Sequence, residues 1–205
     1  MTGKKIPVFD GHCDTATRLV TSDEIDISVR SSEGHVDIPR MREGGVCAQV
    51  FACWVDPDTP PEKWGAYTLK MIRKMRRVLD ANSTELSLAL SGSQVLEANR
   101  SGRMAALIGV EGGHAIGGGM EMLRRIYEEG VRCMTLTWNH DNEIADSCEG
   151  SGSWGGLSPF GREVIAEMDS AGMVVDLSHS SDGTFYDVLE TTSSPVLVSH
   201  SCMRA

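Results

Sequence analysis

Short apolar runs alternate with helix-forming segments along most of this chain of 205 residues. The runs are almost entirely apolar, which is typical of strands that are covered on both faces in a parallel sheet. Because parallel strands need crossover connections, usually helices, the pattern predicts an α/β fold. Six such runs are present, at residues 5–12, 46–55, 104–111, 131–138, 173–179 and 195–200.

Helices are expected between these runs, where apolar residues recur at helical spacing. The longest begins at Pro60 and Pro61, because proline is tolerated in the first turn of a helix. Ser93 is the expected N-cap of a short helix that ends near Asn99. The apolar side of the long helix is formed by Trp64, Leu69, Ile72, Met75 and Leu79.

The second half of the chain continues the alternation. Ser158 is the expected N-cap of a helix that stops at Gly172, with proline directly after the cap. The residues from Asp141 to Gly156 are rich in glycine, serine and acids, so they predict a long loop. Further helices are expected at 120–130 and 182–190.

Six strands are fewer than a closed barrel requires. A (β/α)8 TIM barrel has eight strands and about 250 residues. We therefore predict an incomplete barrel of this type, with about six of eight βα units, in one domain over residues 1–205. An open doubly wound sheet also fits the alternation, but it does not explain why histidines and acids recur at the strand ends.

Composition narrows the class of protein. A formal net charge of −10 disfavours binding to nucleic acid, whose phosphates would be repelled. No run approaches the roughly 18 apolar residues of a membrane span, so we expect no membrane partner and a cytoplasmic location. The six cysteines include no CxxC pair and suggest no disulfide framework. Cys13 is expected to point away from its neighbours His12 and Asp14, because strand side chains alternate.

Five candidate metal ligands lie at the ends of the predicted strands. The carboxyl ends of all strands of a barrel meet on one face, so these side chains are expected to converge. The spacing of His12 and Asp14 places both on the same side of a strand, and a carboxylate at Glu111 can bridge two cations. The candidate ligands are His12, Asp14, Glu111, His179 and His200.

The kind of ligand limits the kind of metal. Imidazoles and carboxylates without a thiolate suit zinc, and also manganese, cobalt or iron, in a site for a pair of divalent cations. A second HxD pair, His35 and Asp37, stands in a polar region and is expected to form a loop or a helix cap. His114 is a candidate for supporting a ligand rather than for binding metal itself.

Other side chains are candidates for contact with a substrate. His140 follows a predicted strand on the face where a substrate would lie, and it could polarise a carbonyl; a loop histidine in water is the alternative. Trp54, Trp138 and Trp154 could form a pocket wall or pack in the core. The three glycines at 117–119 lack the residues of a phosphate-binding loop, and no GxSxG motif is present.

Several segments together resemble the membrane dipeptidase (renal dipeptidase) family of zinc metallopeptidases. They are, in chain order, FDGHCDT, HVDIPRMREGGVCAQVF, LIGVEGGHAI, MTLTWNH, GLSPFGREVIAEM, VDLSHSS and SPVLVSHS. The resemblance implies a (β/α)8 barrel with two zinc ions that hydrolyses dipeptides, including some with a D-residue on the C-terminal side. It also implies that His12 and Asp14 bind one metal, that His179 and His200 bind the other, and that Glu111 bridges them.

Two departures from the family pattern matter. Mammalian members have a substrate-binding histidine where this chain has Trp138, so His140 is the expected replacement. Family members also continue beyond the part that corresponds to residue 205, with an arginine for the substrate carboxylate and an aspartate near the reacting water. We therefore expect little or no activity from this chain alone, and completion by a C-terminal segment or by a second copy in a homo-oligomer.

The expected reaction is metal-dependent hydrolysis, with Glu111 and His140 as the catalytic residues. A hydroxide shared by two cations about 3.5–4 Å apart would attack the scissile carbonyl. One alternative is a non-catalytic remnant that binds metal. Another is a different binuclear amidohydrolase, such as a lactonase or phosphotriesterase, but these commonly carry HxH and a bridging lysine, and no lysine follows Lys74.

Overall fold

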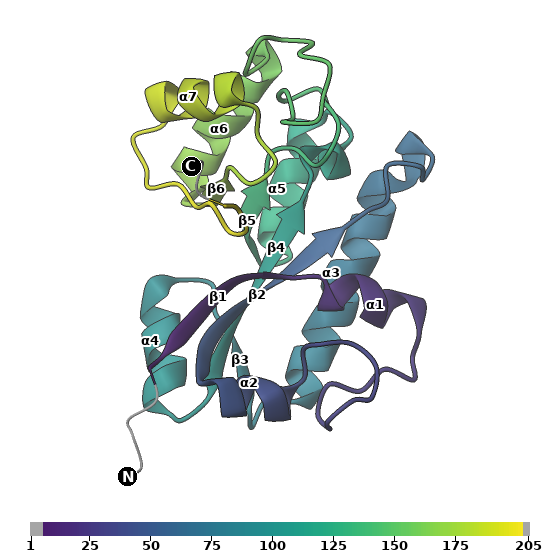
Figure 1. The fold of residues 1–205 in the computed structure, drawn as a ribbon, viewed down its shortest axis with the longest axis vertical. Coiled ribbons are helices and arrows are strands. Elements are labelled where there is room, and N and C mark those ends of the chain that lie inside the picture. The colour runs from purple at the N-terminus through teal and green to yellow at the C-terminus, as the bar shows by residue number, and fades with distance from the viewer. Residues whose placement is uncertain (1–5, 203–205) are drawn as a thin grey trace.

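The computed structural model describes residues 6–202 and contains a curved parallel sheet with helices on its outer face (Figure 1). The strand order is β1-β2-β4-β5-β6, with β3 paired to the first half of β4, and every pair is parallel. The strands are β1 (Val8–Cys13), β2 (Val46–Trp54), β3 (Leu86–Leu88), β4 (Met104–Glu111), β5 (Val131–Thr135) and β6 (Val174–Asp176).

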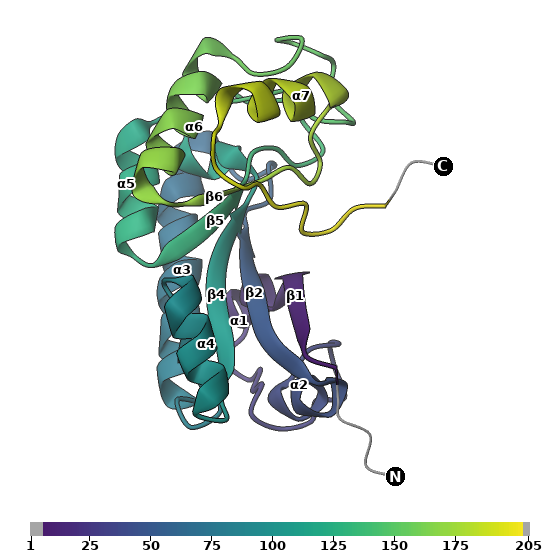
Figure 2. The ribbon, with the colours of Figure 1, turned by 90° about the vertical axis from the view of Figure 1, so that its left-hand side faces the viewer.

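The helices alternate with these strands, as the sequence predicts. Figure 2 shows α3 to α6 together on one side of the sheet, while β1 lies toward the opposite, open side. The arrangement is a half-barrel with helices outside. The helices are α1 (Thr15–Thr21), α2 (Ile38–Gly44), α3 (Trp64–Ala81), α4 (Gly92–Arg100), α5 (Met120–Glu128), α6 (Pro159–Ala171) and α7 (Asp182–Thr191), with 3-10 turns at Pro61–Lys63 and Gly113–Ile116.

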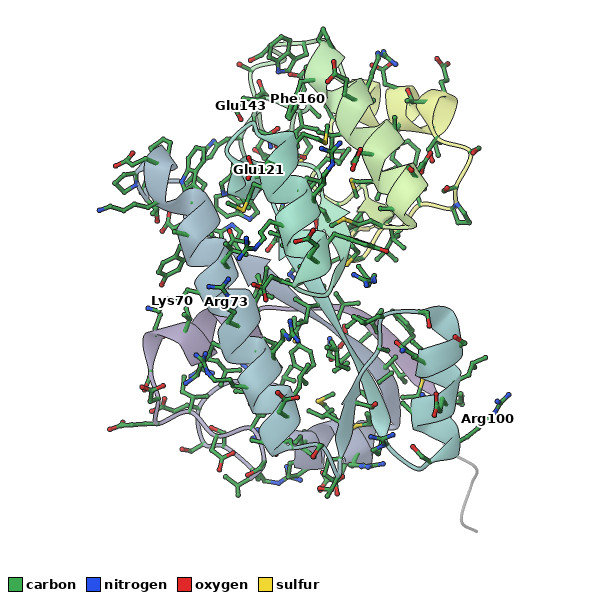
Figure 3. The ribbon with its side chains drawn as sticks, turned by 180° about the vertical axis from the view of Figure 1, so that it is seen from behind. Lys70, Arg73, Arg100, Glu121, Glu143 and Phe160 are labelled. Carbon is green, nitrogen blue, oxygen red and sulfur yellow. The ribbon has the colours of Figure 1, made fainter. Side chains whose placement is uncertain are left out.

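The outer helices are amphipathic, as their sequence periodicity requires. Helix α3 buries Met71, Ile72, Met75 and Leu79 against the sheet, whereas Trp64 is only partly buried. Charged side chains cover the opposite surface, and Figure 3 shows this face from outside with several of them labelled. The labelled residues that are exposed here include Lys70, Arg73, Arg100 and Glu121. No helix within residues 6–202 is long and apolar enough to cross a membrane.

Helix caps explain most of the predicted boundaries and correct one. The hydroxyl of Ser158 accepts a hydrogen bond from the Gly161 amide, and Gly172 ends α6 in the left-handed conformation, as predicted. The predicted cap at Ser93 is wrong, because Ser91 is the residue with the extended backbone and its hydroxyl accepts from the Gln94 amide. Ser93 lies inside α4, with its hydroxyl 2.9 Å from that of Ser91.

One predicted strand is absent and one observed strand was not predicted, so the number of strands agrees although two assignments are wrong. The run 195–200 is not a strand in the structure, since Leu197 forms only an isolated parallel bridge with Asp176. Pro195 lacks an amide hydrogen, and the neighbouring β6 has only three residues with which to pair. Strand β3 was not predicted, because three residues are too short to show a recognisable pattern.

Asp37 is the N-cap of α2, a helix that contacts β2. Its buried carboxylate accepts hydrogen bonds from the backbone amides of Arg40 (2.8 Å) and Ser31 (3.1 Å) and pairs with the Arg40 guanidinium. Burial alone would raise the pKa of Asp37, but these bonds and the Arg40 charge outweigh it and lower the pKa. The predicted loop or cap at this second HxD pair is confirmed for Asp37.

We expect Asp37→Ala to lower the free energy of unfolding by about 0.5–2 kcal/mol, the usual cost of losing an N-cap. The partly buried amide of Ser31 would also lose its acceptor. Urea denaturation measures the change. Asp26→Ala is the matched control, because Asp26 also accepts a hydrogen bond from a backbone amide, that of Ser28, but in an exposed loop. An equal effect of the two substitutions would contradict the importance of the cap.

Candidate metal centre

Three of the five predicted ligands, all histidines, meet around the buried carboxylate of a fourth, Glu111. Glu111 ends β4, and its oxygen Oε2 lies 3.5 Å from His12 Nε2. The other oxygen, Oε1, lies 3.1 Å from His179 Nε2 and 3.4 Å from His200 Nε2. The two imidazole nitrogens of His179 and His200 are 2.8 Å apart. The fifth predicted ligand, Asp14, is at the rim, with Oδ1 3.3 Å from His12 Nε2.

Burial decreases from the centre outward. The side chain of Glu111 is 6% exposed and that of His12 is 13% exposed, whereas that of Asp14 is 68% exposed. The group lines a cavity of about 570 Å³. The other residues lining it are Asp10, Thr17, Arg18, Trp54, Trp138 and Ser199.

Local backbone geometry brings the first and last ligands together. The strand β1 is irregular between Asp10 and Cys13, and the His12 amide donates to the Asp10 carboxylate (3.0 Å). A Cβ atom added to Gly11 would lie 3.0 Å from the carbonyl oxygen of Ser199, a tight contact, so glycine suits this close approach of β1. The ring centroids of His12 and His200 lie 4.0 Å apart. Cys13 points into the core, as predicted.

His179 has a backbone conformation that is uncommon for a residue with a side chain. Its φ is 64°, the only positive value among the non-glycine residues that the structure describes. The carbonyl of His179 accepts a hydrogen bond from the Cys148 amide (2.8 Å), and its Nδ1 lies 3.0 Å from Asn139 Oδ1. Since an amide oxygen only accepts, Nδ1 carries the hydrogen and Nε2 is turned toward Glu111. Such strained residues are concentrated at functional sites.

The donor set fits a metal ion. The ligand atoms of His12, Glu111 and His200 all lie within 4.8 Å of one another. Imidazole and carboxylate ligands without a thiolate suit zinc and related divalent metals. Two facing imidazole nitrogens beside a buried carboxylate form a site that a cation would stabilise.

The charges in this cluster are strongly coupled. Burial would raise the pKa of Glu111, but hydrogen bonds with His179 and His200 and the nearby His12 outweigh burial and lower it to about 2. Burial would lower the pKa of His12, but the hydrogen bond to Asp14 and the charge of Glu111 raise it above 6.5. The metal-free cluster therefore favours an ionised Glu111 beside a protonated His12.

These pKa shifts predict opposite pH dependences with and without metal. The lowered pKa of Glu111 stabilises the fold above about pH 4.5, and this is lost as the pH falls toward 2. The raised pKa of His12 stabilises the fold below pH 6.5, and this is lost as the pH rises through its folded value. Metal binding requires deprotonated imidazoles, so stabilisation by metal grows over that same rise. Thermal melting with chelator and with Zn²⁺, between about pH 5 and pH 8, measures both trends; parallel curves would contradict the prediction.

The remaining predicted residues are divided between two cavities. Trp54 and Trp138 line the first cavity, beside Glu111, with ring centroids 5.0 Å apart. His140 lines a neighbouring cavity of about 270 Å³, which shares only Trp138 with the first. His114 also lines the second cavity, and its Nε2 lies 2.9 Å from the Val55 carbonyl. Trp154 is 49% exposed and lines neither cavity.

Sequence reasoning missed three residues that support the ligands. Asn139 holds His179, and Asp176 and Ser199 form hydrogen bonds beside His200. The repeated Ser-His at the ends of VVDLSH and PVLVSH was a usable signal for Ser199. Asp176 gave the same kind of signal, because an acid within an apolar strand is expected to have a specific partner.

A parallel half-barrel with histidines and acids at its carboxyl edge defines the barrel-type metal-dependent hydrolase class. Residues 2–205 match the family model described as "Membrane dipeptidase (Peptidase family M19)". The chain belongs to this family, as its motifs indicate.

Known relatives agree with this assignment. The chain is 36% identical to dipeptidase verJ of Clonostachys rogersoniana over 212 residues, covering 96% of this chain and 54% of that protein. The metallopeptidase of Rhodobacter sphaeroides liganded with a phosphinate mimic of the dipeptide L-Ala-D-Ala has a TM-score of 0.86 and 25% identity, with 97% of this chain and 66% of that chain covered. The probable dipeptidase PvdM of Pseudomonas aeruginosa shares the fold, with a TM-score of 0.79, 16% identity and coverage of 91% and 54%. The chain thus spans about half the length of the curated relative from Clonostachys rogersoniana.

Proposed function

We propose that this chain carries the metal centre of a dipeptidase that hydrolyses dipeptides, including those with a D-residue at the C-terminal position. The observation that carries the proposal is the position of Glu111 between two groups of ligands. Its Oε2 faces His12, which contacts Asp14, while its Oε1 faces His179 and His200. A carboxylate with each oxygen turned to a different ligand group suits a pair of cations, which we propose to be Zn²⁺.

The side chains have distinct roles in this proposal. When bound, the two cations would supply Lewis acidity and lower the pKa of water, so that hydroxide is available at neutral pH. His12 and Asp14 would hold one cation, His179 and His200 the other, and Glu111 both. Trp54 and Trp138 would exclude water from one side of the cavity.

We propose that His140 contacts the substrate from the adjoining cavity. Its ring centroid is 5.8 Å from that of Trp138, which separates the two cavities. The substrate class is supported by the Rhodobacter sphaeroides relative, which binds a mimic of L-Ala-D-Ala. A cytoplasmic location stays a prediction from the sequence.

The 205-residue polypeptide alone is proposed to bind metal but to turn over slowly. The solved relative contains about a third of its chain outside the matched part. If the unmatched third is needed for turnover, adding a polypeptide that matches it should raise the rate. The chain together with this added polypeptide is called the completed protein below. Full activity of the 205-residue chain alone would refute this part of the proposal.

Metal analysis combined with a dipeptide assay tests the main proposal. The expected result is two Zn²⁺ per chain, with hydrolysis of L-Ala-D-Ala in the completed protein that is lost with chelator and restored by Zn²⁺. Bound metal without hydrolysis in the completed protein would instead support the alternative of a non-catalytic metal-binding protein. Hydrolysis of a lactone or phosphotriester, but not of dipeptides, would support a different binuclear amidohydrolase.

A further inference from the structure

Asp176 is a buried carboxylate outside the proposed ligand set. It ends β6, is 2% exposed, and its hydrogen-bond partners are all neutral. Oδ1 accepts bonds from the Ser178 amide (3.1 Å), the Ser178 hydroxyl (3.0 Å) and the Ser199 amide (3.0 Å). Oδ2 accepts from the hydroxyls of Thr135 (2.7 Å) and Ser199 (2.6 Å). So many donors around one acid indicate a specific purpose, because a buried charge is costly unless its bonds are satisfied.

Ser199 connects this carboxylate to the metal centre. Its hydroxyl oxygen lies 2.6 Å from Asp176 Oδ2 and 2.8 Å from His200 Nδ1. A hydroxyl has one hydrogen, and the shorter, charge-assisted bond to the carboxylate takes it. The remaining contact is then a bond from His200 Nδ1–H to the Ser199 oxygen. The Nε2 lone pair of His200 consequently points to the centre, 3.4 Å from Glu111 Oε1.

The same group of bonds also fixes the backbone around His200. The segment 196–200 is not a strand and has one isolated bridge to β6. The Ser199 amide donates to Asp176, and the next amide, of His200, donates to the Ser178 hydroxyl (3.0 Å). Leu197 still forms backbone hydrogen bonds with Val175 (2.9 Å) and Leu177 (2.8 Å), and after it these bonds to side chains position His200.

We propose that Asp176 and Ser199 are positioning residues that hold His200 as the Nδ1–H tautomer with Nε2 directed at the metal. The inference rests on the proposed function only in taking His200 as a ligand. His179 is an internal comparison, since its Nδ1 is held by the neutral amide of Asn139 and not by this carboxylate. Loss of Ser199 should therefore change one imidazole and leave the other unchanged.

The first test is Ser199→Ala in the full chain. Zn²⁺ affinity, measured by competition with a chromophoric chelator, should fall by roughly 10–100-fold, the usual cost of removing a partner of a metal-binding histidine. Ser199→Thr keeps the hydroxyl and should restore the affinity. Thr135→Val is the matched control, because it removes a bond to the same Asp176 oxygen and leaves the Ser199–His200 link intact. A loss no larger for Ser199→Ala than for Thr135→Val would overturn the proposal.

The second test requires no activity. Nitrogen-15 NMR of the histidine rings in the parent chain with excess Zn²⁺ should show the ring hydrogen of His200 on Nδ1, with slow exchange because it is bonded to Ser199. In Ser199→Ala this hydrogen should exchange faster, whereas that of His179 should be unchanged. A ring hydrogen of His200 on Nε2, or equal exchange in the two chains, would overturn the inference. Conversely, a completed protein that binds Zn²⁺ but hydrolyses no dipeptide would refute the proposed function, while the NMR result would still decide the role of Ser199 and Asp176.

Discussion

Replacing Glu111 with glutamine is expected to remove tight metal binding and, with it, hydrolysis in the completed protein. Glutamine keeps the size of the side chain but loses the negative charge that both ligand groups face. The loss of Zn²⁺ affinity should exceed the roughly 10–100-fold that follows from changing a residue one step removed from the metal. Chelator competition measures the affinity, and metal content per chain measures the stoichiometry.

The folded state should survive this substitution. Glu111 is a buried carboxylate whose interactions with neighbouring imidazoles outweigh its desolvation cost, and a glutamine of the same size keeps only part of them. We expect a modest fall in the metal-free melting temperature at pH 8, while the increase caused by Zn²⁺ disappears. Glu149→Gln, at an exposed position, is the control. Unchanged Zn²⁺ stabilisation in Glu111→Gln would rule out this residue as a bridging ligand.

The largest expected effect on stability away from the centre is that of Gly161→Ala. Alanine normally favours a helix over glycine by about 1 kcal/mol. Here, however, a Cβ atom on Gly161 would lie 2.1 Å from the carbonyl oxygen of Ile144, in the loop between β5 and α6. The same oxygen accepts a bond from the Ser158 amide (2.9 Å), so it cannot move without cost. We expect a net loss of about 1–3 kcal/mol, as for other overpacked sites.

Gly92→Ala is the matched control for this substitution. Gly92 is in the first turn of α4, as Gly161 is in the first turn of α6, and no atom lies within 4 Å of its added Cβ. We expect it to be neutral or slightly stabilising in urea denaturation. Equal changes in the free energy of unfolding at the two positions would show that the loop containing Ile144 shifts to make room for the methyl group at position 161.

The sequence predicted the convergence of the ligands because apolar runs identify parallel strands, and the topology then gathers their ends. His12, Glu111, His179 and His200 needed no further information to be placed together. The distances between them depend on irregularities that periodicity does not contain, such as the positive φ of His179. The run 195–200 illustrates the limit, since its apolar pattern predicts a strand, whereas Leu197 forms an isolated bridge to β6 and side-chain hydrogen bonds hold the next two residues.

The supporting residues were harder to predict for a related reason. Asp176 lies within an apolar strand, and its proposed role in positioning His200 depends on hydrogen-bond donors from β5 and from the segment after α7. Likewise, His140 follows β5 in the chain, but the ring of Trp138 separates it from the ligands. Strand order can be derived from a pattern along the chain, whereas the direction of a loop side chain depends on packing among distant segments.

The close approach of β1 at Gly11 to the carbonyl of Ser199 has a consequence for how a newly made chain matures. The proposed ligands from the first strand and from residue 200 must both be in place before the centre exists, so a cation could bind there only after the strands between them have come together. Metal binding would then follow the assembly of the sheet. Its free energy would stabilise the whole sheet and not one local segment.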